Sequence, residues 1–147
     1  MVAGMDNSEA QDPPAGWSIH TRKSPLTEPW EPIYAQLQPQ AFALAVRVRR
    51  QHCNGRGFAH GGLIAALADN AMGLSAAVVA GEVGGQRPRG AVTTNLALDF
   101  IDSAAIGDWL VVQPTVLKVG RTLAFVECRV LCGDRLIARG NATFRLG

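Results

Sequence analysis

Residues 60–80 read HGGLIAALADNAMGLSAAVVA, and this stretch decides the fold. The run is apolar and long enough for a helix of about 30 Å, with two glycines at its start and a single carboxylate, Asp69, near its middle. Its apolar side chains fall all round a helical wheel instead of on one stripe. The pattern predicts a central, buried helix around which the rest of the chain packs.

Asp69 is the residue in this helix that needs an explanation. An unpaired carboxylate in apolar surroundings costs several kcal/mol or shifts its pKa. The helix alone leaves two interpretations open: either Asp69 or Asn70 lies on a polar seam and pairs with a neighbouring strand, or the carboxylate has a chemical function. The residues upstream of the helix bear on this choice.

Composition bounds the class of protein. The 147 residues are 48% hydrophobic and 18% charged, which is typical of one globular domain. The formal net charge is only +2, and the basic residues are scattered instead of gathered in a tract. We therefore expect one domain without a nucleic-acid partner, although a local phosphate site is compatible with this charge.

The cysteines and the N-terminus bear on the compartment. Cys53, Cys128 and Cys132 form no CxxC pair and are odd in number, so neither a disulfide framework nor a zinc cluster is indicated. Residues 1–16 lack the basic start and apolar core of a secretory signal. Asp69 and the glycines of the helix argue against a membrane span. We expect a soluble, cytoplasmic protein without a membrane partner.

The order of the predicted elements begins with an unstructured segment. Residues 1–16 are polar and lack periodicity, which predicts a disordered leader and leaves residues 17–147 as a single domain. Prolines punctuate residues 17–40 and leave room for one short helix over residues 31–38. Residues 42–50 read FALAVRVRR and predict a strand.

Four further strands follow the central helix. A glycine-rich connection over residues 81–90 leads into runs rich in β-branched and aromatic residues, which turn signals separate at hairpin-like spacing: residues 91–101, 108–120, 122–133 and 135–146. The short connections predict an antiparallel meander. The fold class is therefore α+β, with an antiparallel sheet around one long helix.

The loop before the helix carries the motif with chemical content. Its polar and glycine positions are His52-x-Asn54-x-x-Gly57-x-x-His60-Gly61-Gly62, and Asp69 follows in the helix. The pattern resembles the hotdog-fold thioesterases, in particular the phenylacetate-degradation type of acyl-CoA thioesterase, and the similarity extends over residues 42–146. The resemblance implies a hotdog fold, an assembly that is at least dimeric, and hydrolysis of acyl-CoA. Coenzyme A is then part of the substrate, and no metal or redox cofactor is expected.

Gly61 and Gly62 stand where the helix begins. A helix N-terminus offers unpaired backbone N–H groups and a partial positive charge, and glycine lets a ligand approach that backbone closely. A thioester carbonyl against the Gly61 N–H would have its developing oxyanion stabilised, with Gly62 beside the substrate. The alternative is that both glycines only permit tight packing of the helix on a strand.

The resemblance implies that Asp69 is the general base or nucleophile that drives attack on the thioester carbonyl. Asp69 lies more than about 10 Å from Gly61 along one helix axis. One subunit's Gly61 and its own Asp69 therefore cannot both touch one carbonyl. The spacing favours a site at a two-fold interface, where Asp69 of one subunit faces Asn54 and Gly61 of the other.

Further polar residues are candidates on the same basis. Asn54 could hold the attacking water or the thioester, or form only an ordinary Asn-Gly turn. His60 matches the family's loop histidine and is either a positioning residue or a satisfied structural group, and His52 is a weaker candidate. Thr93 matches a hydroxyl that orients water in the family, although strand propensity also explains it. On a regular strand Thr93 shares a face with Asn95.

Candidate substrate contacts come from loops and from apolar positions. Four cations lie where they could bind the phosphates of coenzyme A: Arg87, Arg89, Lys118 and Arg121. A pocket for an aryl or medium-chain acyl group could be lined by residues that are equally good core residues, namely Leu63, Met72, Phe100 and Trp109. Two rivals stay open: a non-catalytic acyl-CoA-binding domain, and a dehydratase of the same fold, whose His and acidic pattern is missing. Dimer or tetramer also stays open.

Overall fold

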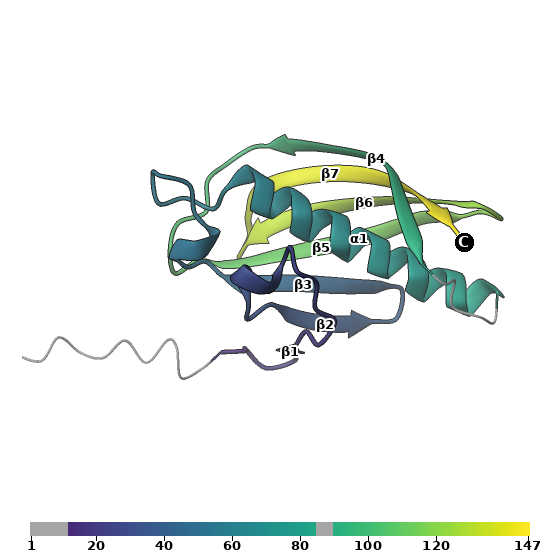
Figure 1. The fold of residues 1–147 in the computed structure, drawn as a ribbon, viewed down its shortest axis with the longest axis horizontal. Coiled ribbons are helices and arrows are strands. Elements are labelled where there is room, and N and C mark those ends of the chain that lie inside the picture. The colour runs from purple at the N-terminus through teal and green to yellow at the C-terminus, as the bar shows by residue number, and fades with distance from the viewer. Residues whose placement is uncertain (1–11, 85–89) are drawn as a thin grey trace, which may run out of the picture.

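A computed structural model describes residues 12–84 and 90–147 as one helix in the concave face of a curved, seven-stranded antiparallel sheet (Figure 1). The helix is α1 (Gly61–Gly84), and the 3-10 helices η2 (Glu28–Trp30) and η3 (Arg50–His52) precede it. The strands are β1 (Ser18–Ile19), β2 (Tyr34–Gln38), β3 (Ala41–Arg47), β4 (Ala91–Phe100), β5 (Trp109–Val119), β6 (Leu123–Cys132) and β7 (Arg135–Leu146). Their order in the sheet is β1-β2-β3-β5-β6-β7-β4.

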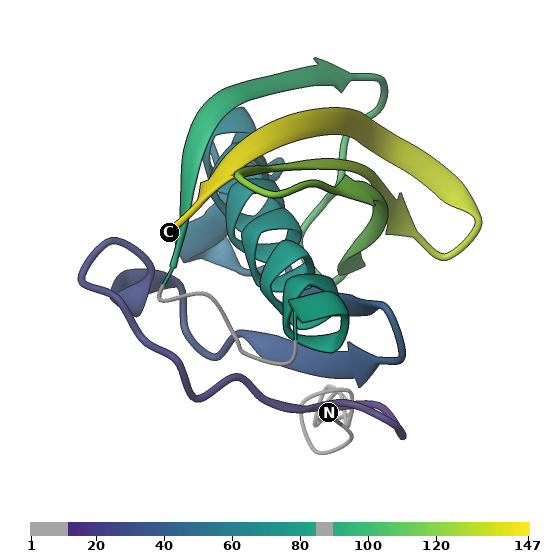
Figure 2. The ribbon, with the colours of Figure 1, turned by 90° about the vertical axis from the view of Figure 1, so that its right-hand side faces the viewer.

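The central helix is confirmed, and its burial is one-sided. The buried positions recur in pairs along α1 and form one stripe against the sheet: Leu63, Ile64, Leu67, Ala68, Ala71, Met72, Ser75 and Ala76. The opposite face, which includes Asp69 and Asn70, is only half-buried. The expectation of a helix wrapped on all sides is therefore wrong for one chain by itself, although the sheet curves around much of α1 (Figure 2).

By length and composition, Gly61–Gly81 is apolar enough to cross a membrane. The core helix of a soluble protein passes the same test, and here the apolar stripe packs against the sheet.

The segment before β3 differs from the prediction. A helix over residues 31–38 is wrong, because Tyr34–Gln38 forms β2 and pairs with β3 in a hairpin, from Tyr34 opposite Ala45 to Gln38 opposite Ala41. Burial of Tyr34 and Ala35 against the sheet outweighs the weak local helix preference.

Packing begins within the segment predicted as a leader. Residues 1–11 lie outside the described residues. The Asp12 carboxylate, however, binds the Arg47 guanidinium through two contacts of 2.7 and 3.1 Å, and this hydrogen bonding lowers the pKa of Asp12. Trp109 contacts the Arg47 guanidinium on its ring face and Trp17 edge-on, with ring centroids 5.6 Å apart. These contacts fasten the start of the described chain to β3 and β5.

The meander is confirmed for β5, β6 and β7 and wrong for β4. In a simple meander β4 would pair with β5. β5 instead pairs with β3, with Leu44 opposite Val112, and with β6 on its other side, so neither edge of β5 is free for β4. β4 pairs instead with β7, from Ala91 opposite Leu146 to Phe100 opposite Ala138. As a result β4 is the last strand of the sheet, and most of its side chains are exposed.

A bulge at Thr94 corrects the predicted faces of β4. Thr93 lies opposite Phe144 and Asn95 lies opposite Thr143, so Thr94 is the additional residue. Residues that lie opposite each other across a ladder point to the same face. Thr93 therefore shares the helix-facing side with Leu96, and Asn95 lies on the outer side, contrary to the expectation for a regular strand.

Gly140 allows β4 to approach β7 closely. A Cβ atom at this position would lie 2.8 Å from the Ala97 carbonyl oxygen, which belongs to backbone and cannot rotate away. We predict that Gly140→Ala lowers the free energy of unfolding by about 2 kcal/mol, as overpacking does elsewhere. Chemical denaturation measures it, with Gly55→Ala as the control, because a Cβ at Gly55 meets nothing within 4 Å. Equal stability of the two variants would contradict the prediction.

Candidate active site

The His52 side chain fixes the loop between β3 and α1 through hydrogen bonds. This side chain is 1% exposed, its Nδ1 accepts the Arg49 N–H at 3.0 Å, and its Nε2 donates to the Trp30 carbonyl at 2.8 Å. The His52 carbonyl also accepts the N–H of His60. His52 is therefore a structural residue that ties η2 to the loop and to the start of the helix.

His60 caps the helix. Its Nδ1 accepts the Gly62 N–H at 2.8 Å, as an N-cap side chain does. A Cβ at Gly62 would lie 3.0 Å from this Nδ1, so glycine is what lets the imidazole approach. Because Nδ1 is an acceptor, the neutral ring carries its proton on Nε2. The Gly62 N–H is used within the chain, whereas the Gly61 N–H has no partner among the described residues.

Asn54 organises the loop through one end of its side chain. Its Oδ1 accepts the N–H groups of Arg56, at 2.9 Å, and Phe58, at 3.3 Å. The turn that the Asn-Gly pair suggested is thus present, and Gly57 completes it with a φ of 83°. The Asn54 side chain is exposed, and its amide N–H groups have no partner among the described residues. They are available to a ligand.

The Asp69 carboxylate is held by Thr93. The Thr93 hydroxyl donates to Asp69 Oδ1 at 2.5 Å, which joins the half-buried face of α1 to the helix-facing side of β4. Both residues line a cavity of about 280 Å³, with Gly73, Ala77 and Phe144 among its walls. The polar seam is therefore real, and it opens into a cavity. Thr93 orients the carboxylate, a role that differs from the predicted orientation of water.

The motif forms two clusters in one chain. Asn54, His60 and Gly61 lie at the start of α1, and His60 and Gly62 line a cavity of about 400 Å³ there. Asp69 lies eight residues along an unbroken helix, a rise of about 12 Å. The structure thus brings Asp69 and Thr93 together and keeps both apart from Asn54 and Gly61.

Several predicted substrate contacts lie elsewhere. Met72 is fully buried under the sheet and cannot line a pocket in this chain, because its side chain belongs to the apolar stripe of α1. Trp109 packs on the N-terminal segment instead of on either cavity. Lys118 and Arg121 are exposed near the turn between β5 and β6 and line neither cavity.

Three further substrate contacts predicted from the sequence are Arg87, Arg89 and Phe100. Arg87 and Arg89 lie outside the described residues. Phe100 is 53% exposed, and its ring lies over the Cα of Gly61, where a Cβ would meet it at 3.4 Å. Sequence reasoning missed the cations that do share the Asp69 cavity, Arg22 and Lys23. No motif in the sequence sets Arg22 and Lys23 apart from the other basic residues of the chain.

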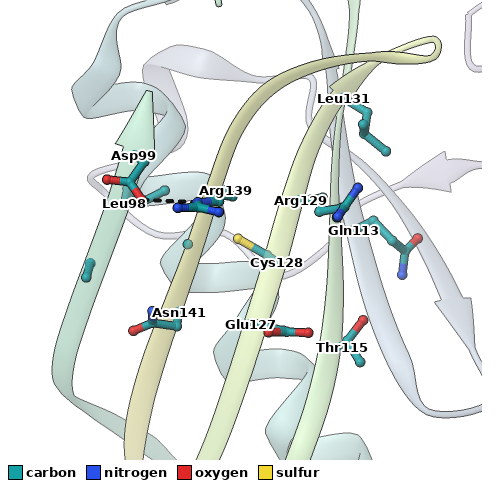
Figure 3. A pocket seen from close by; sticks show the side chains of 12 residues that line it. Leu98, Asp99, Gln113, Thr115, Glu127, Cys128, Arg129, Leu131, Arg139 and Asn141 are labelled. Carbon is teal, nitrogen blue, oxygen red and sulfur yellow. Dashed lines mark hydrogen bonds and ion pairs between the residues drawn. The ribbon is translucent and has the colours of Figure 1, made fainter. Parts of the chain in front are cut away.

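A larger cavity, of about 430 Å³, carries none of the motif residues (Figure 3). It lies across β4 to β7, and exposed charges of both signs line it, including an ion pair of 3.2 Å between Asp99 and Arg139. The nearby thiol of Cys128 is buried, which raises its pKa to about 11 and leaves it a poor nucleophile. The chemistry of the motif is thus concentrated along α1.

Comparison with known proteins assigns the family. The sequence pattern of the thioesterase superfamily matches residues 56–138, which contain the helix cap, Asp69 and Thr93. The chain belongs to the thioesterase superfamily. The predicted hotdog fold and the predicted class, a thioester hydrolase, are confirmed at the level of this family.

Relatives and structural neighbours agree with this assignment. A Pseudomonas aeruginosa protein with a provisional esterase name is 37% identical over 90% of this chain and 96% of its own length. Human acyl-coenzyme A thioesterase 13 is 34% identical over 74% of this chain and 75% of its own.

Two solved structures share the thioesterase fold. PaaI, a phenylacetic acid degradation protein of Thermus thermophilus, was solved as a mutant and superposes with a TM-score of 0.69 at 23% identity, over 84% and 100% of the two chains. A Streptococcus mutans protein bound to acetyl CoA superposes with a TM-score of 0.66 at 22% identity, over 88% and 95%. At this identity both show the fold alone. The resemblance to the hotdog-fold thioesterases is confirmed for the family, and the likeness to a phenylacetic acid degradation protein is a likeness of fold.

Because His52 is buried, we predict that the protein loses stability at acid pH. Burial lowers the pKa of His52 below its ordinary 6.5, so below about pH 6.5 the unfolded chain binds a proton that the folded chain resists. The free energy of unfolding should therefore fall as the pH drops below that value. Denaturation of the wild type and His52→Gln at pH 7.5 and pH 5 tests this. The variant should be less stable at pH 7.5 and lose less on acidification, and an equal loss would refute the role of His52.

Proposed function

We propose that this thioesterase hydrolyses an aryl- or medium-chain acyl-CoA to the free acid and coenzyme A. The observation that carries the proposal is the Asp69 carboxylate, which Thr93 holds and which is open to a cavity on a largely apolar helix. The name of the human relative, an acyl-coenzyme A thioesterase, and the acetyl CoA in the streptococcal structure support an acyl-CoA substrate.

The start of α1 supplies the electrophilic part of the mechanism. The thioester carbonyl accepts a hydrogen bond from the Gly61 N–H, and the positive end of the helix stabilises the oxyanion that develops during attack. The Asn54 amide donates to the same substrate or to the attacking water. His60 acts indirectly, because its Nδ1 fixes the first turn of the helix.

Asp69 supplies the base. Its free oxygen takes a proton from water while the water oxygen attacks the carbonyl carbon, which gives a tetrahedral oxyanion. When the intermediate collapses, the carbon–sulfur bond breaks, coenzyme A leaves as the thiolate, and the proton passes to this sulfur. Direct attack by the carboxylate, with an anhydride that water then cleaves, gives the same products. The fixed Thr93 hydroxyl orients the carboxylate for either route.

The separation along α1 supports a complete site that lies between two subunits. Gly61 and Asp69 of one chain are too far apart for one carbonyl, which favours a site where Asp69 meets Gly61 of a second copy. β4 offers the surface for such a pairing, because its outer edge is unpaired within residues 12–84 and 90–147 and carries exposed apolar residues, Val92 at 65% and Phe100 at 53%. A long open edge of this kind favours strand addition. We propose a homodimer, which can associate further.

Asp69→Asn tests the chemistry directly. We expect a loss of at least about a hundredfold in kcat, because general-base catalysis contributes this much, while acyl-CoA still binds. Thr93→Val should lose about tenfold and Thr93→Ser should stay near the wild type, because serine keeps the donor. Release of free thiol from a panel of aryl- and alkyl-acyl-CoA substrates measures these rates.

The outcomes also separate the rival function. An Asp69→Asn protein with wild-type kcat would exclude the carboxylate from the mechanism. A wild type that binds acyl-CoA yet releases no thiol from any member of the panel would favour the non-catalytic binding domain.

A mixed dimer tests the shared site. Asp69→Asn and Asn54→Ala are each expected to be inactive. When the two chains are co-expressed with different tags, a mixed dimer holds one site with both residues intact, so the random mixture should recover about a quarter of the wild-type activity. A site contained within one chain recovers none, and sedimentation velocity confirms that mixed dimers are present.

A further inference from the structure

The cavity that holds Asp69 is closed on one side by a segment outside the family motif. Residues 20–27 contribute His20, Arg22, Lys23, Ser24 and Thr27 to its lining, whereas α1 contributes small residues such as Gly73 and Ala77. The wall formed by residues 20–27 is therefore polar and basic, whereas the wall along the helix carries Asp69 and Asn70 at one end and apolar residues beyond them.

The basic segment is held in place by its own contacts. The His20 N–H donates to the Ile33 carbonyl at 2.8 Å, and the hydroxyls of Ser24 and Thr27 lie 3.0 Å apart. Thr27 is 4% exposed, and η2, which follows directly, is tied to the loop by His52. The cations are thus attached to a packed segment at the mouth of the cavity.

The three basic side chains in this wall differ in whether they can bind an anion. Lys23 pairs with Glu31 at 3.2 Å, which offsets its charge. His20 packs edge-on against Phe42, and its pKa is lowered by burial and by the neighbouring Arg22, so it is neutral at pH 7. Arg22 has no carboxylate within ion-pair distance in the described part of the chain. Among the described residues that line this cavity, Arg22 is the cation that is free to bind an anion.

The position of the cavity indicates which part of the substrate enters it. The cavity, of about 280 Å³, lies directly beside Asp69, whereas a long flexible arm carries the nucleotide of coenzyme A away from the thioester. The acyl group lies on the other side of the thioester and matches a cavity of this size. With the carbonyl beside Asp69, the far end of the acyl group points to the basic wall.

We propose, on the basis of the hydrolysis proposed above, that the preferred acyl group ends in a carboxylate that binds Arg22. The planar guanidinium suits a carboxylate through two parallel hydrogen bonds. Repulsion from Asp69 also disfavours a second negative charge close to the thioester and favours one at the far wall. The substrate class is then the mono-CoA thioester of a dicarboxylic acid.

A matched pair of substrates tests this preference. Adipyl-CoA and hexanoyl-CoA differ only in a terminal carboxylate in place of a methyl group. We expect the wild type to prefer adipyl-CoA in kcat/KM, and Arg22→Gln to reduce this preference about tenfold, since a partly exposed charged hydrogen bond is lost. Arg22→Lys should retain part of it, and Arg129→Gln, an exposed cation on the outer face of β6, should retain all of it.

Truncated thioesters separate the acyl end from the coenzyme A end. Adipyl and hexanoyl thioesters of N-acetylcysteamine lack the phosphates, and the Arg22→Gln effect on the preference should persist with them. The proposal is overturned if Arg22→Gln leaves the preference unchanged. It is also overturned if the variant raises KM equally for both CoA substrates and has no effect on the truncated ones, because Arg22 would then bind phosphate. Failure of hydrolysis itself is distinct, since no thioester would then release thiol.

Discussion

Burial of one stripe of α1 in the concave face of the sheet is the interaction on which the rest of this structure depends. Leu67 and Met72 are fully buried there, together with Leu44 and Val112 from the strands beneath. Dense packing fixes the helix rotation, because turning it would expose these side chains and bury polar ones. Asp69 is consequently held on the half-buried face, where β4 passes over it. The position of the Asp69 carboxylate is thus a consequence of core packing.

The same helix gives the site its two halves. Its N-terminus presents an unpaired amide and a positive dipole, and its middle presents a carboxylate, but a rigid rod keeps them about 12 Å apart. In the proposed dimer, each chain therefore holds complementary halves of two sites. The exposed edge of β4 then has a physical purpose in the proposed dimer, because pairing there would bring the second helix alongside the first.

The histidines illustrate how similar residues take different roles. His52 is buried between η2 and the loop and serves as a neutral connector with both nitrogens occupied. His60, which is exposed, uses one nitrogen to cap α1. His20 lies in the wall of the Asp69 cavity and is kept neutral, and Lys23 is paired with Glu31, so the unpaired positive charge among the described residues of that wall belongs to Arg22. In each case the neighbouring backbone and burial decide the role.

The sequence by itself determined the central helix, the strands that follow it and the motif from Asn54 to Asp69, because hydrophobic periodicity is a local property. The helix rise between Gly61 and Asp69 is local too, and it is the basis on which a second subunit is predicted. Tertiary structure alone decided the strand at residues 34–38, the place of β4 beside β7 and the bulge that turns Thr93 toward Asp69. It also buried Met72 and brought Arg22 to the cavity. These features depend on which sheet edges are free and on contacts between residues far apart in the chain, and no local pattern encodes either.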